Sequence, residues 1–212
     1  MIYSRLTRRN LPPDYLENDM KFIIATKNKH KLSELQRILS PLNIDAICEN
    51  DLDFPLDNVE ETGETFEENA RLKAVAACEQ TGIPAIADDS GLCVDALLGE
   101  PGIFSARYSK SGKSEDNIDK LLENMKETPE GKRTARFVCV ICVVYPDGKE
   151  ITVRGECEGK IAFAPQGNGG FGYDPVFISE KGCFALISDA EKNEISHRGQ
   201  ALKRLYEALL KN

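Results

Sequence analysis

Short apolar stretches of strand length alternate with amphipathic helical stretches through the first half of this sequence. Residues 21–25, 44–47 and 83–87 have the composition of buried strands. One amphipathic helix follows the first of them and is closed by Pro41, and a second opens at Thr65. The alternation predicts an α/β fold in which helices surround an elongated, mixed β-sheet and two lobes flank a cleft.

The second half of the sequence is richer in strands. Residues 136–145 and 150–154 are predicted to form a hairpin across a Pro-Asp-Gly turn, and a further strand covers residues 157–163. Amphipathic helices are predicted at about 115–126 and 197–210. We expect these strands to extend the sheet that begins in the first half.

The helix that opens at Thr65 carries the clearest local signals. Thr65 and Glu68 have the spacing of a capping box, and Gly82 follows the last predicted turn. The predicted apolar stripe comprises Phe66, Ala70, Ala74 and Ala77. Asn69 and Lys73 lie four residues apart and therefore share a face of the helix. Lys73 either extends along the apolar stripe to solvent or reaches a bound phosphate.

Composition and charge exclude some classes of protein. The chain has 212 residues, of which 41% are hydrophobic, and a formal net charge of −8 at pH 7. Nucleic acid would be repelled on average, so no nucleic-acid partner is expected. No apolar run approaches the roughly 18–20 residues that span a bilayer, so no membrane association is expected. Residues 1–19 are predicted to be a disordered extension, and residues 21–212 a single domain.

The seven cysteines are irregularly spaced, and no secretory signal precedes them. This favours a reduced, cytoplasmic protein. Cys139 and Cys142 form a C-x-x-C motif inside a predicted buried strand. Residues three apart in a strand point to opposite faces. We therefore expect these two cysteines to pack in the core, in preference to a shared metal ion or a redox pair.

The acidic run Asp88-Asp89-Ser90-Gly91 follows directly on the predicted strand 83–87. Ligands of α/β sheets bind beyond the carboxyl ends of strands, and Mg²⁺ prefers carboxylate and phosphate oxygens. The run is thus either the start of a metal site or an ordinary solvated turn. Glu61 could supply a second carboxylate if the fold brings it to Asp89; alone it reads as half of a surface charge pair with Glu60.

A basic turn precedes the first helix. Residues 26–31 contain three lysines at a strand-to-helix junction, where free backbone N–H groups favour phosphate. The turn lacks the glycines of a P-loop, so it is not a Walker motif. It is either a phosphate-binding turn or a solvated basic turn, and the acidity of the remaining chain favours the first interpretation.

The segment 167–175 is the most unusual in composition, with four glycines in its first six residues. Glycine permits close approach of the backbone to a ligand, and Phe171 and Tyr173 offer rings for stacking on a base. Ser196 has the character of an N-cap for the last helix, and the guanidinium of Arg198 suits a carbonyl oxygen and a ring nitrogen.

Taken in order, these segments resemble the inosine-triphosphate pyrophosphatase family, which hydrolyses non-standard purine nucleoside triphosphates. The resemblance covers about residues 21–210. The matching stretches are residues 26–31, 61–69 with Lys73, 87–92 with Val94 and Asp95, 101–108, 169–175, and Lys192 with 196–199. Only residues 1–19 depart from the family pattern.

The resemblance implies a role for each matching residue. Glu61 and Asp89 would bind Mg²⁺, and Asp89 would also accept a proton from the attacking water. Lys73 would act with Asp89 at the phosphates. The implied substrate-binding residues are Thr26, Lys27, Asn28, Lys29, His30, Lys31, Ser90, Phe171, Gly172, Tyr173, Asp174, Lys192, His197 and Arg198. Among them, Phe171 would stack on the purine, and Lys192, His197 and Arg198 would read the base.

The implied activity is Mg²⁺-dependent hydrolysis of ITP, dITP and XTP to the monophosphate and pyrophosphate by a homodimer. One alternative is the septum-inhibitor type of nucleotide pyrophosphatase, which acts on modified pyrimidine triphosphates; the segments 171–174 and 196–198 argue against it. A second alternative is a nucleotide-binding regulatory module without activity. The presence of both Glu61 and Asp89 argues against that interpretation.

Overall fold

The computed structural model describes residues 20–26, 29–52 and 54–211, with the backbone alone for Met20, Lys29, His30, Glu34 and Ile38. In this part of the chain, seven strands form one sheet in the order β2-β1-β3-β4-β5-β6-β7. The strands are β1 (Met20–Ile24), β2 (Ile44–Cys48), β3 (Ala85–Val94), β4 (Thr134–Val144), β5 (Glu150–Ile161), β6 (Phe177–Ser179) and β7 (Gly182–Cys183). The α-helices are α1 (Lys29–Leu39), α2 (Phe66–Thr81), α3 (Ser114–Asn124), α4 (Asp189–Ile195) and α5 (His197–Lys211).

The sheet is mixed. Strand β1 pairs in parallel with β2 and β3, whereas β6 is antiparallel to both β5 and β7. The predicted hairpin corresponds to the consecutive neighbours β4 and β5. The predicted α/β class is therefore confirmed, and the cleft flanked by two lobes stays a prediction.

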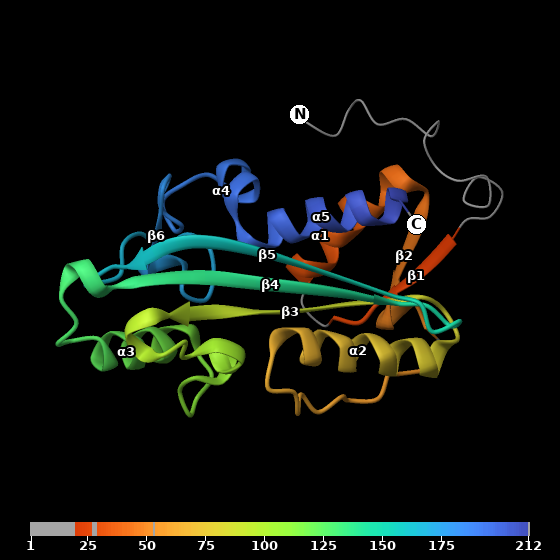
Figure 1. The fold of residues 1–212 in the computed structure, drawn as a ribbon, viewed down its shortest axis with the longest axis horizontal. Helices are drawn as coiled ribbons and strands as arrows, with labels where there is room; N and C mark the ends of the chain where they lie inside the picture. The colour runs from red at the N-terminus through yellow and green to blue at the C-terminus, as the bar shows by residue number, and fades with distance from the viewer. Residues whose placement is uncertain (1–19, 27–28, 53, 212) are drawn as a thin grey trace. The chain divides into compact units, whose positions relative to one another are not determined.

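The chain divides into two compact units. The first comprises the chain up to Asp89 together with residues 140–153 and 202–212. In this unit α2 covers one face of the strands, and α1 lies on the other (Figure 1). Residues 22–24 of β1 are fully buried, as expected for a parallel strand with a helix on each face.

The second unit comprises residues 90–139 and 154–201. Its hydrophobic core joins β3, β4, β5 and α3, which contributes Ile118 and Leu121. Three phenylalanine rings form its centre: Phe137 lies 4.6 Å from Phe177 and 5.9 Å from Phe184, between ring centroids. Helices α3 and α4 lie on opposite faces of the strands in this unit (Figure 1).

Helix α2 begins and ends where the sequence predicts. The hydroxyl of Thr65 accepts a hydrogen bond from the N–H of Glu68, and the Glu68 carboxylate accepts one from the N–H of Thr65. Gly82 closes the helix in the left-handed conformation. The predicted stripe is buried throughout: Phe66, Ala70, Ala74 and Ala77. Local chemistry therefore specifies this helix completely.

Strand β3 differs from the prediction. The strand was predicted to end at residue 87, but it continues through Asp88-Asp89-Ser90-Gly91 to Val94. Asp88 and Asp89 are only 4% and 8% exposed. The strand continues because each carboxylate has a lysine partner, so neither must leave the sheet to be solvated.

Strand β5 is also longer than predicted. The separate strands expected at 150–154 and 157–163 are one strand that runs through Gly155 to Ile161. Gly155 does not mark a break; it allows close packing of α5. A Cβ atom on Gly155 would lie 2.2 Å from the carbonyl oxygen of His197 and 2.4 Å from the nitrogen of Ala201.

The substitution Gly155→Ala is therefore expected to lower the free energy of unfolding by about 1–3 kcal/mol, because the helix backbone must move to admit the methyl group. Urea denaturation measures the change. Gly131→Ala is the matched control, since no atom lies within 4 Å of its added Cβ. Equal stability of the two variants would contradict this account of β5.

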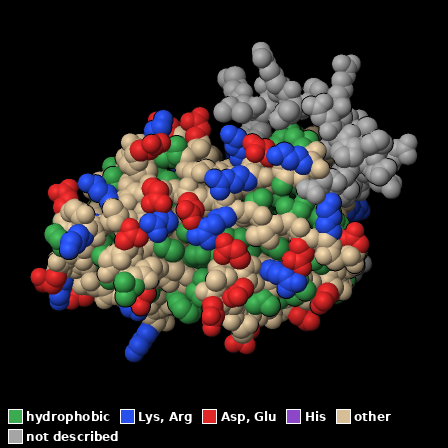
Figure 2. All heavy atoms as spheres, viewed as in Figure 1, with side chains coloured by type: hydrophobic (Ala, Val, Ile, Leu, Met, Phe, Trp, Pro, Cys, Tyr) green, Lys and Arg blue, Asp and Glu red, His purple; other side chains and the backbone are tan. Residues whose placement is uncertain are grey.

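The cysteines behave as the strand pattern predicts. Cys139 and Cys142 are buried in β4, and none of the seven cysteines, each of them described, is in a disulfide bond. Acidic and basic side chains are interspersed over the face shown in Figure 2. Among the described residues, no helix is both long enough and apolar enough to cross a membrane. Residues 1–19, predicted to be an extension, lie outside the described residues.

Candidate functional site

Two carboxylates and one lysine of the first unit meet at the centre of the candidate site. Lys73 on α2 contacts Glu61 through an Nζ–Oε1 distance of 2.8 Å and Asp89 through an Nζ–Oδ1 distance of 3.4 Å. Glu61, 28 positions before Asp89 in the chain, thus shares a single ammonium group with it. The fold therefore brings together two acidic residues that are far apart in the sequence.

Asp88 has a different partner. Its Oδ2 lies 2.7 Å from the Nζ of Lys31 on α1. Successive side chains of a strand point to opposite faces of a sheet. Asp88 therefore faces the lysine of α1, and Asp89 faces the lysine of α2. The two helices lie on opposite faces of these strands (Figure 1).

Charge and burial act together on this group. Burial raises the pKa of Asp89, as do the carboxylates of Glu61 and Asp88, and the ammonium groups of Lys73 and Lys31 only partly offset these effects. For Lys73, burial alone would lower the pKa, but Asp89 and Glu61 outweigh it and the pKa rises. Lys73 therefore stays protonated, while Asp89 is a stronger base than an exposed aspartate.

The donor set fits a hard divalent cation that also takes ligands from its substrate. The carboxylates of Glu61 and Asp89 converge on one position, where both contact the ammonium group of Lys73, itself a cation. The Oδ2 atom of Asp89 is buried, and no hydrogen-bond donor in the described part of the chain reaches it. The described residues hold no group of three or more His, Cys, Asp or Glu side chains arranged as a complete metal site. Two carboxylates that rely on phosphate oxygens for the remaining ligands match Mg²⁺.

The basic turn is described only in part. Thr26 ends the segment after β1, where Ala25 donates a backbone hydrogen bond to Ile86 of β3. Helix α1 begins at Lys29, so the predicted junction of turn and helix is confirmed. Lys27 and Asn28 lie outside the described residues, as do the side chains of Lys29 and His30. Lys31 is the lysine of this turn whose side chain the structure describes, and it lies beside the carboxylate of Asp88.

In the second unit, the glycine-rich loop is held by a buried carboxylate. Asp174 Oδ2 accepts a hydrogen bond from the N–H of Phe171 at 2.7 Å and lies 2.5 Å from the Nζ of Lys192. The same Nζ lies 4.6 Å from the centroid of the Phe171 ring. Gly170 and Gly172 adopt positive φ, which lets the loop fold back onto Asp174. Phe171 itself is half-exposed and can stack on a planar ligand.

The start of α5 brings Arg198 to this loop. The Ser196 hydroxyl accepts a hydrogen bond from the N–H of Gly199, so the predicted N-cap is confirmed. The guanidinium of Arg198 lies 5.9 Å from the Phe171 ring centroid, and its Nη2 is 3.4 Å from the Ser90 hydroxyl. His197 is buried and stacks on Phe137 at 4.7 Å.

Tyr173 does not offer the stacking surface that its position in the loop suggests. Its ring is buried in the core, and its hydroxyl donates a hydrogen bond to the carbonyl of Ser105 at 2.9 Å. Burial raises the pKa of Tyr173. Ser105 was missed as a supporting residue, although it lies in one of the matching stretches; its hydroxyl also accepts the N–H of Leu92 in β3. Tyr173 therefore anchors the loop, and Phe171 alone presents a ring.

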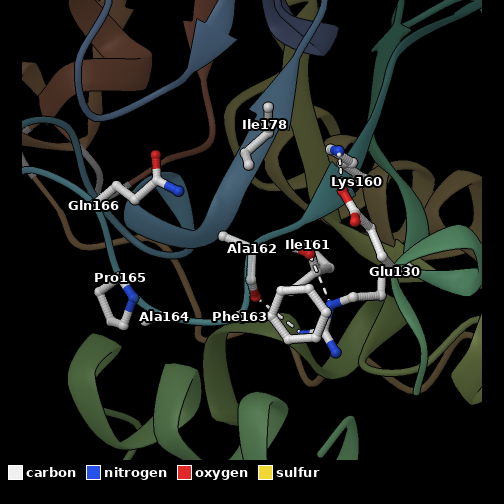
Figure 3. A pocket seen from close by; sticks show the side chains of 10 residues that line it. Glu130, Lys160, Ile161, Ala162, Phe163, Ala164, Pro165, Gln166 and Ile178 are labelled. Carbon is white, nitrogen blue, oxygen red and sulfur yellow. Dashed lines mark hydrogen bonds and ion pairs between the residues drawn. The ribbon is translucent and has the colours of Figure 1, made fainter.

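A pocket of about 370 Å³ in the second unit is separate from these residues (Figure 3). It lies beside the side chains of Glu130, Lys160 and Phe163, and its lining includes none of the predicted site residues. The buried guanidinium of Arg133 lies beneath the Phe163 ring, 4.3 Å from its centroid. Arg133 donates to the carbonyls of Met125, Thr128, Ile161 and Ala162. The guanidinium of Arg133 thus serves to stabilise the main chain.

Comparison with known proteins settles the family. The model of the Ham1 family matches residues 22–208, which is nearly all of the described chain. The chain belongs to the Ham1 family. A relative from Symbiobacterium thermophilum named dITP/XTP pyrophosphatase is 49% identical over 190 residues, covering 89% of this chain and 94% of that protein. A protein of the same name from Shigella flexneri is 48% identical, covering 89% of this chain and 98% of its own.

Solved Ham1 structures share the fold. The HAM1 protein of Coxiella burnetii superposes with a TM-score of 0.85 at 40% identity, covering 91% of this chain and all of its own. The Ham1 protein of Staphylococcus aureus gives a TM-score of 0.82 at 42% identity, covering 89% and 97% of the two chains. The resemblance expected from the ordered motifs is therefore confirmed at the level of the family and its fold.

Proposed function

We propose that this Ham1 protein hydrolyses non-standard purine nucleoside triphosphates, namely ITP, dITP and XTP, to the monophosphate and pyrophosphate with Mg²⁺ as cofactor. Family membership and the relatives named dITP/XTP pyrophosphatase make the chain a nucleoside-triphosphate pyrophosphatase, a hydrolase acting on acid anhydrides. The single observation that carries the finer proposal is the convergence of Glu61 and Asp89 on the ammonium of Lys73.

The residues of the first unit perform the phosphate chemistry. Asp89 accepts the proton of a water molecule that attacks the α-phosphorus, and the bond to the bridging oxygen of the β-phosphate breaks, releasing pyrophosphate. Its raised pKa suits a proton acceptor. Lys73 and Lys31 neutralise the phosphates. When bound to Glu61 and Asp89, Mg²⁺ supplies Lewis-acid stabilisation of phosphate oxygens.

The residues of the second unit select the base. Phe171 stacks on the purine, and Lys192, His197 and Arg198 supply hydrogen-bond donors around it. Inosine and xanthosine carry an acceptor oxygen at C6, whereas adenine carries an amino group that would face these donors. Unpaired polar groups in a buried site cost a few kcal/mol, which corresponds to roughly 10²-fold discrimination against ATP.

A pyrophosphate-release assay across ITP, XTP, GTP and ATP, with and without Mg²⁺, tests the proposal. We expect kcat/KM for ITP and XTP to exceed that for ATP by roughly 10²-fold or more, and release to stop when EDTA removes the metal. Equal rates on ATP and ITP would contradict the account of base selection. Binding without release would instead favour a regulatory module.

The cytoplasm and a homodimeric state complete the proposal. None of the seven cysteines, all of which the structure describes, is in a disulfide bond, which supports a reducing compartment. In the second unit, Leu98 is 99% exposed and Phe104 is 53% exposed within one short segment. Large apolar side chains exposed in one segment support contact with a second copy of the chain. Light scattering during size-exclusion chromatography would report about twice the mass of the chain for the dimer and the single mass for a monomer.

A further inference from the structure

Asn69 is a buried polar residue of α2 that the proposed chemistry does not use. Its side chain has no solvent exposure. Its Oδ1 accepts a hydrogen bond from the N–H of Gly63 at 2.9 Å. No hydrogen-bond acceptor in the described part of the chain reaches its Nδ2. The buried Nδ2 costs stability, so the bond that Oδ1 accepts from Gly63 is the feature of this side chain to explain.

The residue that Asn69 holds is close in sequence to one of the two carboxylates. Gly63 follows Glu61 by two positions, and Asn69 precedes Lys73 by one helical turn. A Cβ atom on Gly63 would lie 2.7 Å from Asn69 Oδ1 and 2.7 Å from Glu68 Cβ. The chain therefore passes α2 as closely as a glycine permits, and Asn69 is the side chain that it approaches.

Neighbouring bonds attach the later part of this segment to the start of α2. The Glu68 carboxylate accepts hydrogen bonds from the N–H groups of Glu64 and Thr65 at 2.6 Å and 3.2 Å. These bonds cap the helix. The bond from the Gly63 N–H to Asn69 attaches the segment to α2 one residue closer to Glu61. The carboxylate of Glu61 in turn contacts Lys73.

We propose that Asn69 is a positioning residue for Glu61. By fixing Gly63 against α2, it holds the Glu61 carboxylate where it can share one divalent cation with Asp89. The inference rests on the proposed function, because it takes Glu61 and Asp89 as the metal ligands. Residues that orient metal ligands through hydrogen bonds typically change metal affinity by about 10–100-fold when replaced.

Direct binding of Mn²⁺ to the full chain, followed by electron paramagnetic resonance without nucleotide, tests the inference. Mn²⁺ serves as the probe because carboxylate oxygens suit it as they suit Mg²⁺. Asn69→Ala removes the acceptor for Gly63 and is expected to weaken Mn²⁺ binding about tenfold. Asn69→Asp keeps an oxygen at that position and adds a negative charge, so its affinity is expected to equal or exceed that of the wild type.

Asn117→Ala is the matched control. Asn117 is a buried asparagine of α3 that accepts a hydrogen bond from the N–H of Ser109 at 2.6 Å, in the second unit. The Asn117→Ala variant is expected to be less stable than the wild type but to keep its affinity for Mn²⁺. Wild-type affinity in Asn69→Ala, or an equal loss in Asn69→Ala and Asn69→Asp or in Asn69→Ala and Asn117→Ala, would overturn the inference.

Glu61→Gln separates this inference from the proposed function. If Glu61→Gln loses Mn²⁺ affinity while Asn69→Ala retains it, Glu61 is a ligand and only the positioning role fails. If Glu61→Gln binds Mn²⁺ as tightly as the wild type, Glu61 is not a ligand and both fail. The Asn69→Asp variant keeps the test decisive should Asn69→Ala fold poorly.

Discussion

The substitution Asp89→Asn is expected to reduce kcat on ITP or XTP by about 10³–10⁴-fold, because the amide neither accepts the proton of the attacking water nor binds Mg²⁺ as a carboxylate does. The two side chains have nearly the same shape, so the strand and its contacts should persist. Initial rates of pyrophosphate release at saturating substrate measure the effect. Near-normal turnover would remove Asp89 from its proposed role.

The same variant should not be less stable than the wild type, which separates lost chemistry from lost structure. Burial raises the pKa of Asp89 in the folded protein. Between its unfolded and folded pKa values the folded protein binds more proton, so the contribution of this group to stability falls as the pH rises through that range. At neutral pH the asparagine variant avoids burying a charge. Urea denaturation should therefore give an equal or higher midpoint.

The substitution Lys73→Met is expected to lower kcat by about 10²–10³-fold and, in the opposite sense, to tighten metal binding about tenfold. Turnover falls because no ammonium group compensates the charge on the phosphates. Metal affinity rises because the same ammonium group contacts both Glu61 and Asp89 in the free protein and repels an incoming cation. Rate assays at saturating Mg²⁺ and calorimetric titration of the metal measure the two effects separately.

Arg71→Met is the matched control for Lys73→Met, since it removes a positive charge from the same helix. Arg71 pairs with Glu150 at 2.7 Å, more than half of its side chain is exposed, and it does not contact the carboxylates of the site. We expect its metal affinity and kcat to stay near those of the wild type. Weaker metal binding in Lys73→Met would show that Lys73 organises the carboxylates and does not compete with the cation.

Local signals explain which parts of the fold could be predicted. The boundaries of α2 follow from Thr65, Glu68 and Gly82, which act within a few residues of the helix ends. Helix α4 carries an equally local signal, the capping box of Ser188 and Glu191, but the prediction did not use it. Elements specified by short-range chemistry can therefore be read from the sequence.

The remaining features depend on contacts between distant residues. Two adjacent aspartates ordinarily mark the end of a buried strand, and only their pairing with lysines from two different helices keeps β3 continuous. A glycine inside a strand ordinarily predicts a break in that strand, whereas Gly155 leaves room for the backbone of α5. The sequence alone does not show whether the ring of Tyr173 faces a ligand or the core. In the structure it lies in the core, where its hydroxyl bonds to Ser105.

Because β3 is continuous, the number of residues in this strand is itself constrained. Asp88 and Asp89 reach lysines on opposite faces of the sheet because they are consecutive residues of an unbroken strand. A single-residue insertion or deletion before them would turn each carboxylate toward the wrong face without changing any functional side chain. Such a change in spacing is therefore expected to be more damaging than a conservative substitution among the buried residues 85–87.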